Sequence, residues 1–221
     1  GLHMHMWSDM VTAAGVTAKS QPSWSSNGTG YDVATTAYTP EEFDKIVKWG
    51  KNAFTTHGLP APILYRAGGW QMNSPLMKVL ADNGFKVDSS ARNFTKFGTN
   101  QMPVPWYLSA TSKPYKPSLS DQNRAGNDSI NIWEFPNNGD NSSNYGKDST
   151  TVIENFKLNY DGSALTQKQT LVVLSHIQLF SNDEPVMRRY FTEVSKHLAS
   201  DDNGPVVYTT IQKVLPEYEA K

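Results

Sequence analysis

The chain has 221 residues, a formal net charge of −1 and no cysteine. The length suits one sizeable domain, the balanced charge gives no reason to expect nucleic acid or an anionic membrane surface as a partner, and no apolar run approaches the roughly 18 residues of a membrane-spanning helix. Without cysteine, disulfides, cysteine-ligated zinc and a thiol nucleophile are excluded.

Two histidines, His3 and His5, lie one residue apart at the start of the chain. In an extended strand the side chains at i and i+2 point to the same face, so both imidazoles could bind one cation. Neutral imidazole is a common ligand of zinc, and a hydrolytic site usually needs a third protein ligand and an open position for water. That third ligand is expected upstream of Gly1. The alternative is that these residues are a remnant of cloning.

The first half of the chain predicts helices that alternate with strands. Residues 15–38 are rich in Ser, Thr, Gly and Asn and predict a loop. Residues 39–58 predict a helix, because the segment opens with a Thr–Pro–Glu–Glu capping box and ends at glycine. A short strand at 63–65, a second helix at 74–84 and a strand at 85–87 follow.

The second half predicts the same alternation, interrupted by long polar segments. Residues 93–129 form a polar excursion, and loops of this length are often functional. The run Leu–Val–Val–Leu at 171–174 predicts a strand that is buried on both faces. The remaining predicted elements are a strand at 130–135, a helix at 185–198, a strand at 206–208 and a short helix near 210–218.

This alternation predicts an α/β fold with a mostly parallel sheet. In such folds the chemistry is found at the carboxyl ends of the strands. Three polar residues lie at such ends, and these are Arg66, Asp88 and His176.

Taken in order with the histidine pair, these residues resemble the polysaccharide deacetylase family, which comprises metal-dependent carbohydrate esterases. Five short motifs in fixed order define the family. The histidine pair is similar to the second motif, in the one-residue spacing of a branch linked to exopolysaccharides. The later motifs are similar to Arg66 with Trp70, to Asp88 after the strand at 85–87, and to Leu174 with His176. Gly68 stands where the family usually has a proline.

The first motif of the family has no counterpart in this sequence. It carries an Asp that acts as base and usually another that binds the metal. The resemblance therefore implies a distorted (β/α) barrel whose first strand or strands are missing from this chain. Residues 1–221 are expected to be a single catalytic-type domain, the C-terminal part of a longer deacetylase domain. An upstream segment or a partner chain would then complete the barrel.

The resemblance implies hydrolysis of N- or O-acetyl groups on an acetylated polysaccharide. His3 and His5 would bind a divalent metal, with zinc as the first choice, and the metal would activate a water. His176 would act as general acid. Arg66 would orient the upstream base, and Asp88 would hold Arg66 or His176 in place.

Four residues are expected to contact the substrate. Trp70 would line the acetyl pocket or stack on a sugar ring, and Leu174 would pack under the acetyl methyl group. Trp106 and Tyr107, within the long polar excursion, are candidate platforms for sugar rings.

Two alternatives compete with this interpretation. A barrel amidohydrolase also has two histidines at the end of its first strand, but it needs further histidine ligands on later strands. His57 and His197 fall at helix or loop positions, so this alternative fails on spacing. A non-catalytic carbohydrate-binding or structural module with the same barrel would also explain the missing first motif. We expect an extracytoplasmic location, because a cysteine-free chain fits an exported protein, although cytoplasmic proteins can lack cysteine too.

Overall fold

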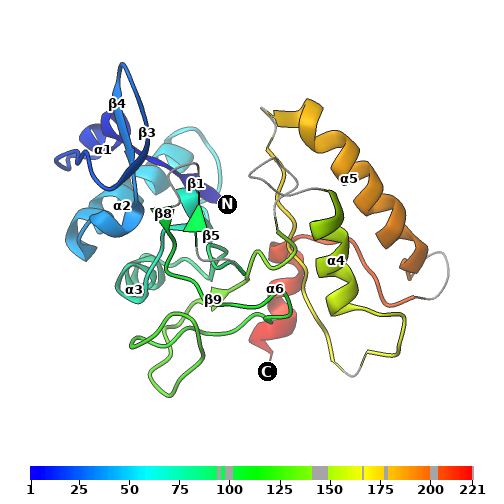
Figure 1. The fold of residues 1–221 in the computed structure, drawn as a ribbon. Coiled ribbons are helices and arrows are strands. Elements are labelled where there is room, and N and C mark those ends of the chain that lie inside the picture. The colour runs from blue at the N-terminus through cyan, green and yellow to red at the C-terminus, as the bar shows by residue number, and fades with distance from the viewer. Residues whose placement is uncertain are drawn as a thin grey trace. The chain divides into compact units, whose positions relative to one another are not determined.

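The computed structural model describes residues 1–93, 96–97, 102–140, 149–165, 167–176, 179–199 and 204–220. The chain forms two compact units, which are described separately below (Figure 1). Unit 1 comprises Gly1–Ser109 and Pro114–Pro136, and unit 2 comprises Ala110–Lys113 and Asn137–Lys221. Among the described residues, no helix combines the length and the apolar character that crossing a membrane would require.

Unit 1 is built on a four-stranded parallel sheet in the order β1-β5-β6-β9. Its strands are β1 (Leu2–Met4), β5 (Leu64–Ala67), β6 (Val87–Asp88) and β9 (Trp133–Glu134). The predicted parallel sheet is therefore present. In the part of the chain that the structure describes, β1 and β9 are its outer strands and the sheet does not close into a barrel.

Helix α2 (Pro40–Thr56) starts where the sequence predicts. The backbone N–H of Glu42 donates to Thr39 Oγ1 over 3.3 Å, and the Glu42 carboxylate accepts from the backbone N–H of Thr39 over 2.8 Å. These paired bonds form the capping box, which satisfies two N–H groups at the helix start. A Cβ on Gly50 would lie 3.0 Å from the sulfur of Met4, so α2 packs closely on β1.

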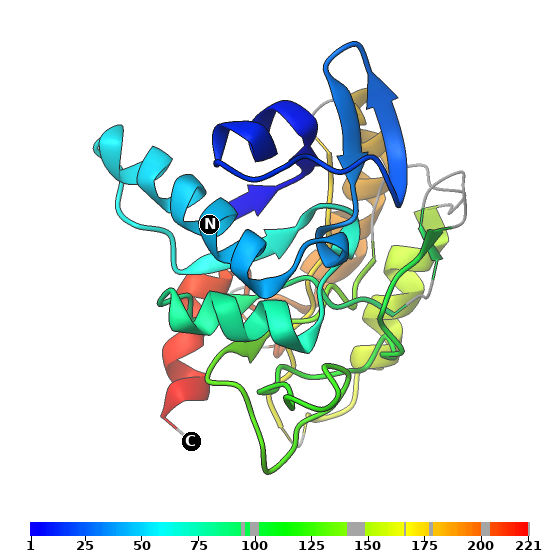
Figure 2. The same cartoon turned by 90° about the vertical axis from the view of Figure 1, so that its left-hand side faces the viewer.

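Helix α3 (Ser74–Asp82) lies beside α2 (Figure 2). The side chain of Asn73 accepts a hydrogen bond from the backbone N–H of Leu76 and thereby caps the helix start. The 3-10 turn η2 (Gly68–Trp70) connects β5 to this helix. Strand, turn and helix therefore follow in the predicted order.

The predicted loop at 15–38 is wrong, because it contains a hairpin made of β3 (Ser23–Asn27) and β4 (Gly30–Val33). The hairpin joins β2 (Met6–Trp7) in a three-stranded sheet, with β4 in the middle. It stands beside α1 (Ser8–Ala13), and a 3-10 turn, η1 (Thr35–Ala37), follows it (Figure 2). Strand β3 is Ser-rich and largely exposed, so it lacks the apolar alternation that marks a half-buried strand, and the short β4 buries only Asp32 and Val33.

The predicted excursion at 93–129 contains a short strand pair, β7 (Lys96–Phe97) with β8 (Met102–Pro103). Further along, single bridges link Pro117 to Ala125 and Ser118 to Ser129. These bridges fold the polar segment back on itself.

Unit 2 contains the helices α4 (Ser149–Asn159), α5 (Phe180–Val194) and α6 (Ile211–Glu219), with a 3-10 turn η4 (Ser195–His197) after α5. Figure 1 shows α4 and α5 side by side. Their contact is a small apolar core, formed by Val152, Phe156, Tyr190 and Val194. Helix α5 starts five residues before the predicted position, with Pro185 inside it.

The prediction of a fully buried strand at 171–174 is wrong. These residues are only partly buried, and the structure assigns no strand to them. Gly139 donates its N–H to Val172 O and Leu174 donates to Asp140 O, each over 3.0 Å. The segment therefore lies extended beside residues 138–140. A strand buried on both faces would need layers packed against both of its sides.

Candidate functional site

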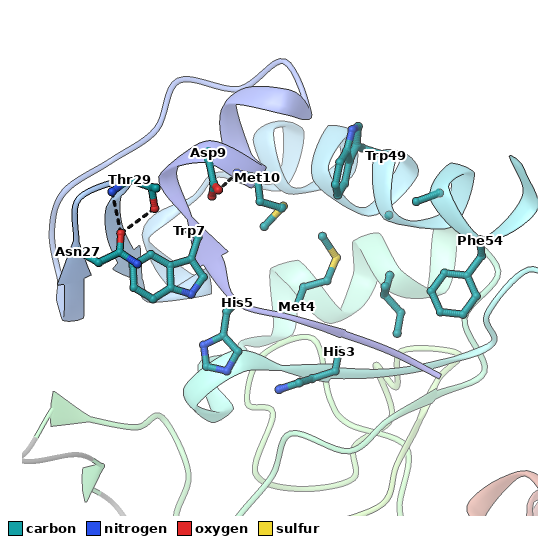
Figure 3. A pocket seen from close by; sticks show the side chains of 13 residues that line it. His3, Met4, His5, Trp7, Asp9, Met10, Asn27, Thr29, Trp49 and Phe54 are labelled. Atoms are coloured by element: carbon teal, nitrogen blue, oxygen red, sulfur yellow. Dashed lines mark hydrogen bonds between the residues drawn. The ribbon is translucent and has the colours of Figure 1, made fainter. Parts of the chain in front are cut away.

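The histidine pair is positioned by the alternation of β1 in unit 1. Leu2 and Met4 are buried, whereas His3 is exposed and His5, directly after the strand, is half-buried. The two imidazoles project from the opposite side of the strand to Met4 (Figure 3). Their ring centroids are 5.1 Å apart, with the planes at 85°.

One nitrogen of each imidazole is engaged by the protein. His3 Nδ1 lies 2.9 Å from the carbonyl oxygen of Arg66, and His5 Nδ1 lies 2.6 Å from Asp32 Oδ2. Both partners are acceptors, so in the neutral rings each Nδ1 carries the proton and each Nε2 carries the lone pair. This is the tautomer of a histidine that ligates a metal through Nε2, with the other nitrogen oriented by an acceptor.

Asp32 is a site residue that the sequence reasoning did not find. It lies on β4 and is 2% exposed. Its Oδ2 also accepts from Trp24 Nε1 over 2.7 Å, while Oδ1 is buried and has no hydrogen-bond partner among the described residues. No local pattern marks Asp32, because its place beside His5 depends on the pairing of β2 with β4, in which Trp7 faces Asp32.

Two glycines let the turn after β5 approach the histidine. A Cβ on Gly68 would lie 2.7 Å from Cγ of His5 and 2.8 Å from the carbonyl oxygen of Met4. Gly69 has φ +59°, and a Cβ there would meet the Trp24 ring at 2.7 Å. A Cβ does not tolerate contacts this short, so Gly68 leaves the space that the His5 imidazole occupies. This is the position at which the polysaccharide deacetylase family usually has a proline.

Arg66 is half-buried at the end of β5. Its Nε donates to the carbonyl oxygen of Ser89 over 2.8 Å, and its Nη2 donates to Ser89 Oγ over 2.7 Å. Ser89 thus accepts the hydrogen bonds that hold the guanidinium, while Asp88 acts on it as a neighbouring charge. Burial lowers the pKa of Arg66, and the charges of Asp88 and Glu134 oppose that shift.

Asp88 forms a buried carboxyl pair with Glu134, a residue that the sequence analysis did not single out. The two face each other on β6 and β9, and both are fully buried. Asp88 Oδ1 accepts from Ser90 Oγ over 2.7 Å, and Glu134 Oε1 accepts from the backbone N–H of Ala91 over 2.9 Å. Burial raises the pKa of Asp88 to about 6, and burial together with the Asp88 charge raises the pKa of Glu134. The pair therefore holds a proton at a pH where exposed carboxyls have lost theirs.

The aromatic residues differ in what they can contact. Trp70 is buried, and the guanidinium of Arg92 lies 3.7 Å from its ring centroid. Trp106 is 0% exposed and donates its Nε1–H to the carbonyl oxygen of Trp70. The prediction of Trp106 as a sugar platform is therefore corrected, since a platform needs an exposed ring face. Tyr107 is 77% exposed, and its role as a platform stays a prediction.

The predicted residues Leu174 and His176 belong to unit 2. Leu174 is partly buried. The backbone N–H of His176 donates to Asp183 Oδ2 over 2.8 Å, and the hydroxyl of Ser175 donates to the same oxygen. Asp183 is fully buried on α5, so it fixes the backbone on which His176 is carried. The role of His176 as general acid stays a prediction.

A pocket of about 570 Å³ in unit 1 extends along β1 (Figure 3). It reaches residues of both faces of β1, which is an outer strand of its sheet in the part of the chain that the structure describes. Its lining is contributed by Leu2, His3, Met4, His5, Trp7, Asp9, Met10, Asn27, Thr29, Trp49, Gly50, Ala53 and Phe54. Within the described ranges, no three or more His, Cys, Asp or Glu side chains gather as a metal-binding group.

No family model matches the chain, and no curated protein matches it either. Among solved structures it is similar to a Mycobacterium smegmatis protein provisionally assigned as a polysaccharide deacetylase, with a TM-score of 0.51 and 19% sequence identity. The match covers 87% of this chain and 64% of that protein, so the chain spans less than two thirds of its neighbour's length. At this identity the likeness shows the fold, a mixed α/β fold with a parallel sheet similar to that of a polysaccharide deacetylase.

Proposed function

We propose that this chain belongs to a metal-dependent deacetylase that removes N- or O-acetyl groups from a polysaccharide. The observation that carries the proposal is the histidine pair, because both rings lie side by side with Nδ1 held by an acceptor. The similarity of the fold to a polysaccharide deacetylase supports the same reaction class.

The residues present fit a divalent metal, with zinc as the first choice. His3 and His5 would hold it through Nε2, since both Nδ1 atoms are hydrogen-bonded to oxygen acceptors. When bound, such a metal supplies a water whose pKa is lowered to roughly 7. A hydrolytic metal site usually has three protein ligands, and His3 and His5 supply two of them. We propose that a residue other than His3, His5 and Asp32 supplies the third.

The other residues of the chain orient and balance charge. The carbonyl of Arg66 and the carboxylate of Asp32 hold the two imidazoles, and Ser89 holds the Arg66 guanidinium. The positive charge of Arg66 favours the ionised form of a carboxylate base, which the family resemblance expects upstream of Gly1. We assign His176 as the proton donor to the leaving group on the same resemblance.

Metal binding tests the first part of the proposal. Protein stripped with a chelator is titrated with Zn²⁺ in a calorimeter, as wild type and as His3→Ala, His5→Ala and His57→Ala. His57 is an exposed imidazole at the end of α2 and serves as the matched control. Loss of a residue that only supports a metal ligand weakens metal binding by up to about a hundredfold. Because His3 and His5 would be ligands themselves, we expect the first two variants to lose more affinity than that. Equal affinity in all four proteins would overturn the metal site.

Acetate release tests the reaction. The longest natural form of the protein, loaded with Zn²⁺, is incubated with chitin oligomers, peptidoglycan or acetylated exopolysaccharide, and free acetate is measured. We expect acetate from at least one polymer, and less of it from His5→Ala and His176→Ala. Polymer binding without acetate release would favour the non-catalytic carbohydrate-binding module instead.

A further inference from the structure

We infer that Asp32 is a positioning residue, which holds the imidazole of His5 in the orientation and tautomer that present Nε2 to a metal. The inference rests on the proposed function, because it names a residue that prepares the same site. It adds a second element to that site, the β3–β4 hairpin, which the sequence analysis treated as a loop.

The contact between the two side chains is short and shielded from solvent. His5 Nδ1 and Asp32 Oδ2 are 2.6 Å apart, and Asp32 is 2% exposed. A hydrogen bond to an ionised carboxylate is roughly twice as strong as one between neutral groups. With so little of Asp32 exposed, water has little access to compete for the carboxylate.

Trp24 fixes the carboxylate from the other side. Its indole Nε1 donates to the same Asp32 oxygen over 2.7 Å. The indole also lies edge-on to the His5 ring, with 5.9 Å between centroids and 83° between planes. The acceptor that orients His5 is thus itself oriented by a rigid aromatic side chain.

The backbone of Asp32 is held on both sides. β4 is the central strand of its sheet, where Asp32 faces Trp7 on β2 and Ser25 on β3. Because β2 begins immediately after His5, the pairing that places Asp32 also fixes the chain that carries the histidine. The hairpin and the histidine therefore keep their spacing without a bound ligand.

A neutral imidazole has two tautomers, and only the Nδ1–H form leaves Nε2 able to ligate. An acceptor at Nδ1 selects this form before any metal arrives. Losing such an acceptor behind a ligand typically weakens metal binding by about 10–100-fold. Gly68 leaves the space in which the ring lies, because a Cβ there would meet His5 Cγ at 2.7 Å, and Asp32 holds the ring within that space.

The first test reads the histidine without metal. In ¹⁵N-labelled, chelator-treated protein, the ring nitrogens of His5 are assigned and its tautomer is measured at a pH where the ring is neutral. We expect Nδ1–H in the wild type, with the Nδ1 proton resonance far downfield because of the short bond to a carboxylate. In Asp32→Asn that proton should move upfield, and in Asp32→Ala both tautomers should be populated.

The second test reads metal affinity with the same variants. We expect Zn²⁺ to bind Asp32→Ala about 10–100-fold more weakly than the wild type, with a smaller loss in Asp32→Asn. Asp82→Ala, which removes an exposed carboxylate on α3, serves as the control and should bind as the wild type does.

The two tests separate this inference from the proposed function. An unchanged Nδ1 proton in Asp32→Asn, together with unchanged affinity, would overturn the role of Asp32 even if the wild type binds zinc. A wild type that binds no zinc would overturn the proposed metal site, whereas the NMR comparison would still decide whether Asp32 sets the tautomer. Asp32→Asn keeps the size and an acceptor oxygen, so the comparison does not depend on the Ala variant folding.

Discussion

Gly68 controls the space available to the imidazole of His5. A Cβ at this position would meet His5 Cγ at 2.7 Å and a backbone oxygen at 2.8 Å, and neither atom is the mobile end of a side chain. We expect Gly68→Ala to displace the imidazole and to weaken Zn²⁺ binding by roughly tenfold or more, as seen when a ligand's support is lost. Isothermal titration calorimetry measures this change, and circular dichroism checks that the variant is folded.

Gly28 supplies the matched control for that substitution. It lies in the turn of the β3–β4 hairpin, and a Cβ there would have no neighbour within 4 Å. Gly28→Ala should therefore bind zinc like the wild type. If the two alanine variants bound zinc equally well, the crowding at Gly68 would not be what positions His5.

The buried pair of Asp88 and Glu134 makes stability depend on pH. Both pKa values are raised in the folded state by burial, so between about pH 4 and the raised values the folded chain binds more protons than the unfolded chain. The free energy of unfolding must then fall as the pH rises through this window. The contribution of this carboxyl pair to stability is therefore largest at a pH below the window.

Replacing Glu134 by its amide reduces that dependence, because Asp88 is then the only carboxyl of the pair that titrates. In Glu134→Gln the amide stays neutral at every pH, so the folded chain no longer has to release the proton that burial keeps on Glu134. We expect the variant to be more stable than the wild type at pH 8, and the difference to shrink toward pH 4, because the raised pKa of Glu134 destabilises only the wild type as the pH rises. Urea unfolding across this range measures it, and Glu41→Gln on the exposed start of α2 should show no such trend.

At the level of single residues, the sequence predicted those side chains whose position follows from local geometry. His3 and His5 share a face because strand side chains alternate, and Arg66 and Asp88 lie at strand ends. Asp32 and Glu134 could not be predicted in this way, because their neighbours depend on which strands pair and in what register. Trp106 is buried and its indole N–H donates to the backbone carbonyl of Trp70, and its position in a polar segment did not indicate this burial.

At the level of elements, α2 links helix capping to the histidine strand. The capping box at Thr39 fixes the helix start, and the helix packs on β1 through Gly50. Replacing a capping Thr by Ala typically costs about 1 kcal/mol. We expect Thr39→Ala to lower the free energy of unfolding by about this amount, as measured by urea denaturation.

Thr56→Ala, at the other end of the same helix, is the comparison for that change. Thr56 is exposed, and its hydroxyl donates to the backbone carbonyl of Asn52, one turn earlier in the same helix. It should leave stability within a few tenths of a kcal/mol of the wild type, a typical result for surface positions. A loss as large as that of Thr39→Ala would argue against the capping box as the cause.

The helices with caps were predictable, and the weakly patterned elements were not. The start signals of α2 and α3 are formed by residues that are close in the sequence, and so are their stop signals, so both can be recognised without knowledge of the fold. Strand β3 is Ser-rich and largely exposed, and the β3–β4 hairpin is held in place by the pairing of β4 with β2. Residues 171–174 show the opposite error, since an apolar run alone does not provide the neighbours that a buried strand needs.

At the scale of the whole molecule, the division into two units predicts which segments a bound metal would stabilise. The histidine pair, Asp32 and the turn at Gly68 all belong to unit 1, whereas the apolar core between α4 and α5 belongs to unit 2. A ligand that binds only the folded form stabilises what it binds by about 2.7 kcal/mol when present at a hundred times its dissociation constant. Such stabilisation appears as slower amide exchange in the segments that must open to release the ligand.

We therefore expect Zn²⁺ to slow hydrogen–deuterium exchange in β1, β2 and β4 and to leave α4 and α5 unchanged, as measured by mass spectrometry of peptides. In His5→Ala the slowing in unit 1 should disappear, because the ligand is gone, whereas His57→Ala should retain it. Equal slowing across both units would mean that the metal stabilises more than the histidine-bearing unit. Slowing in α4 and α5 alone would place the zinc at residues other than His3 and His5, and the proposed site would then be wrong.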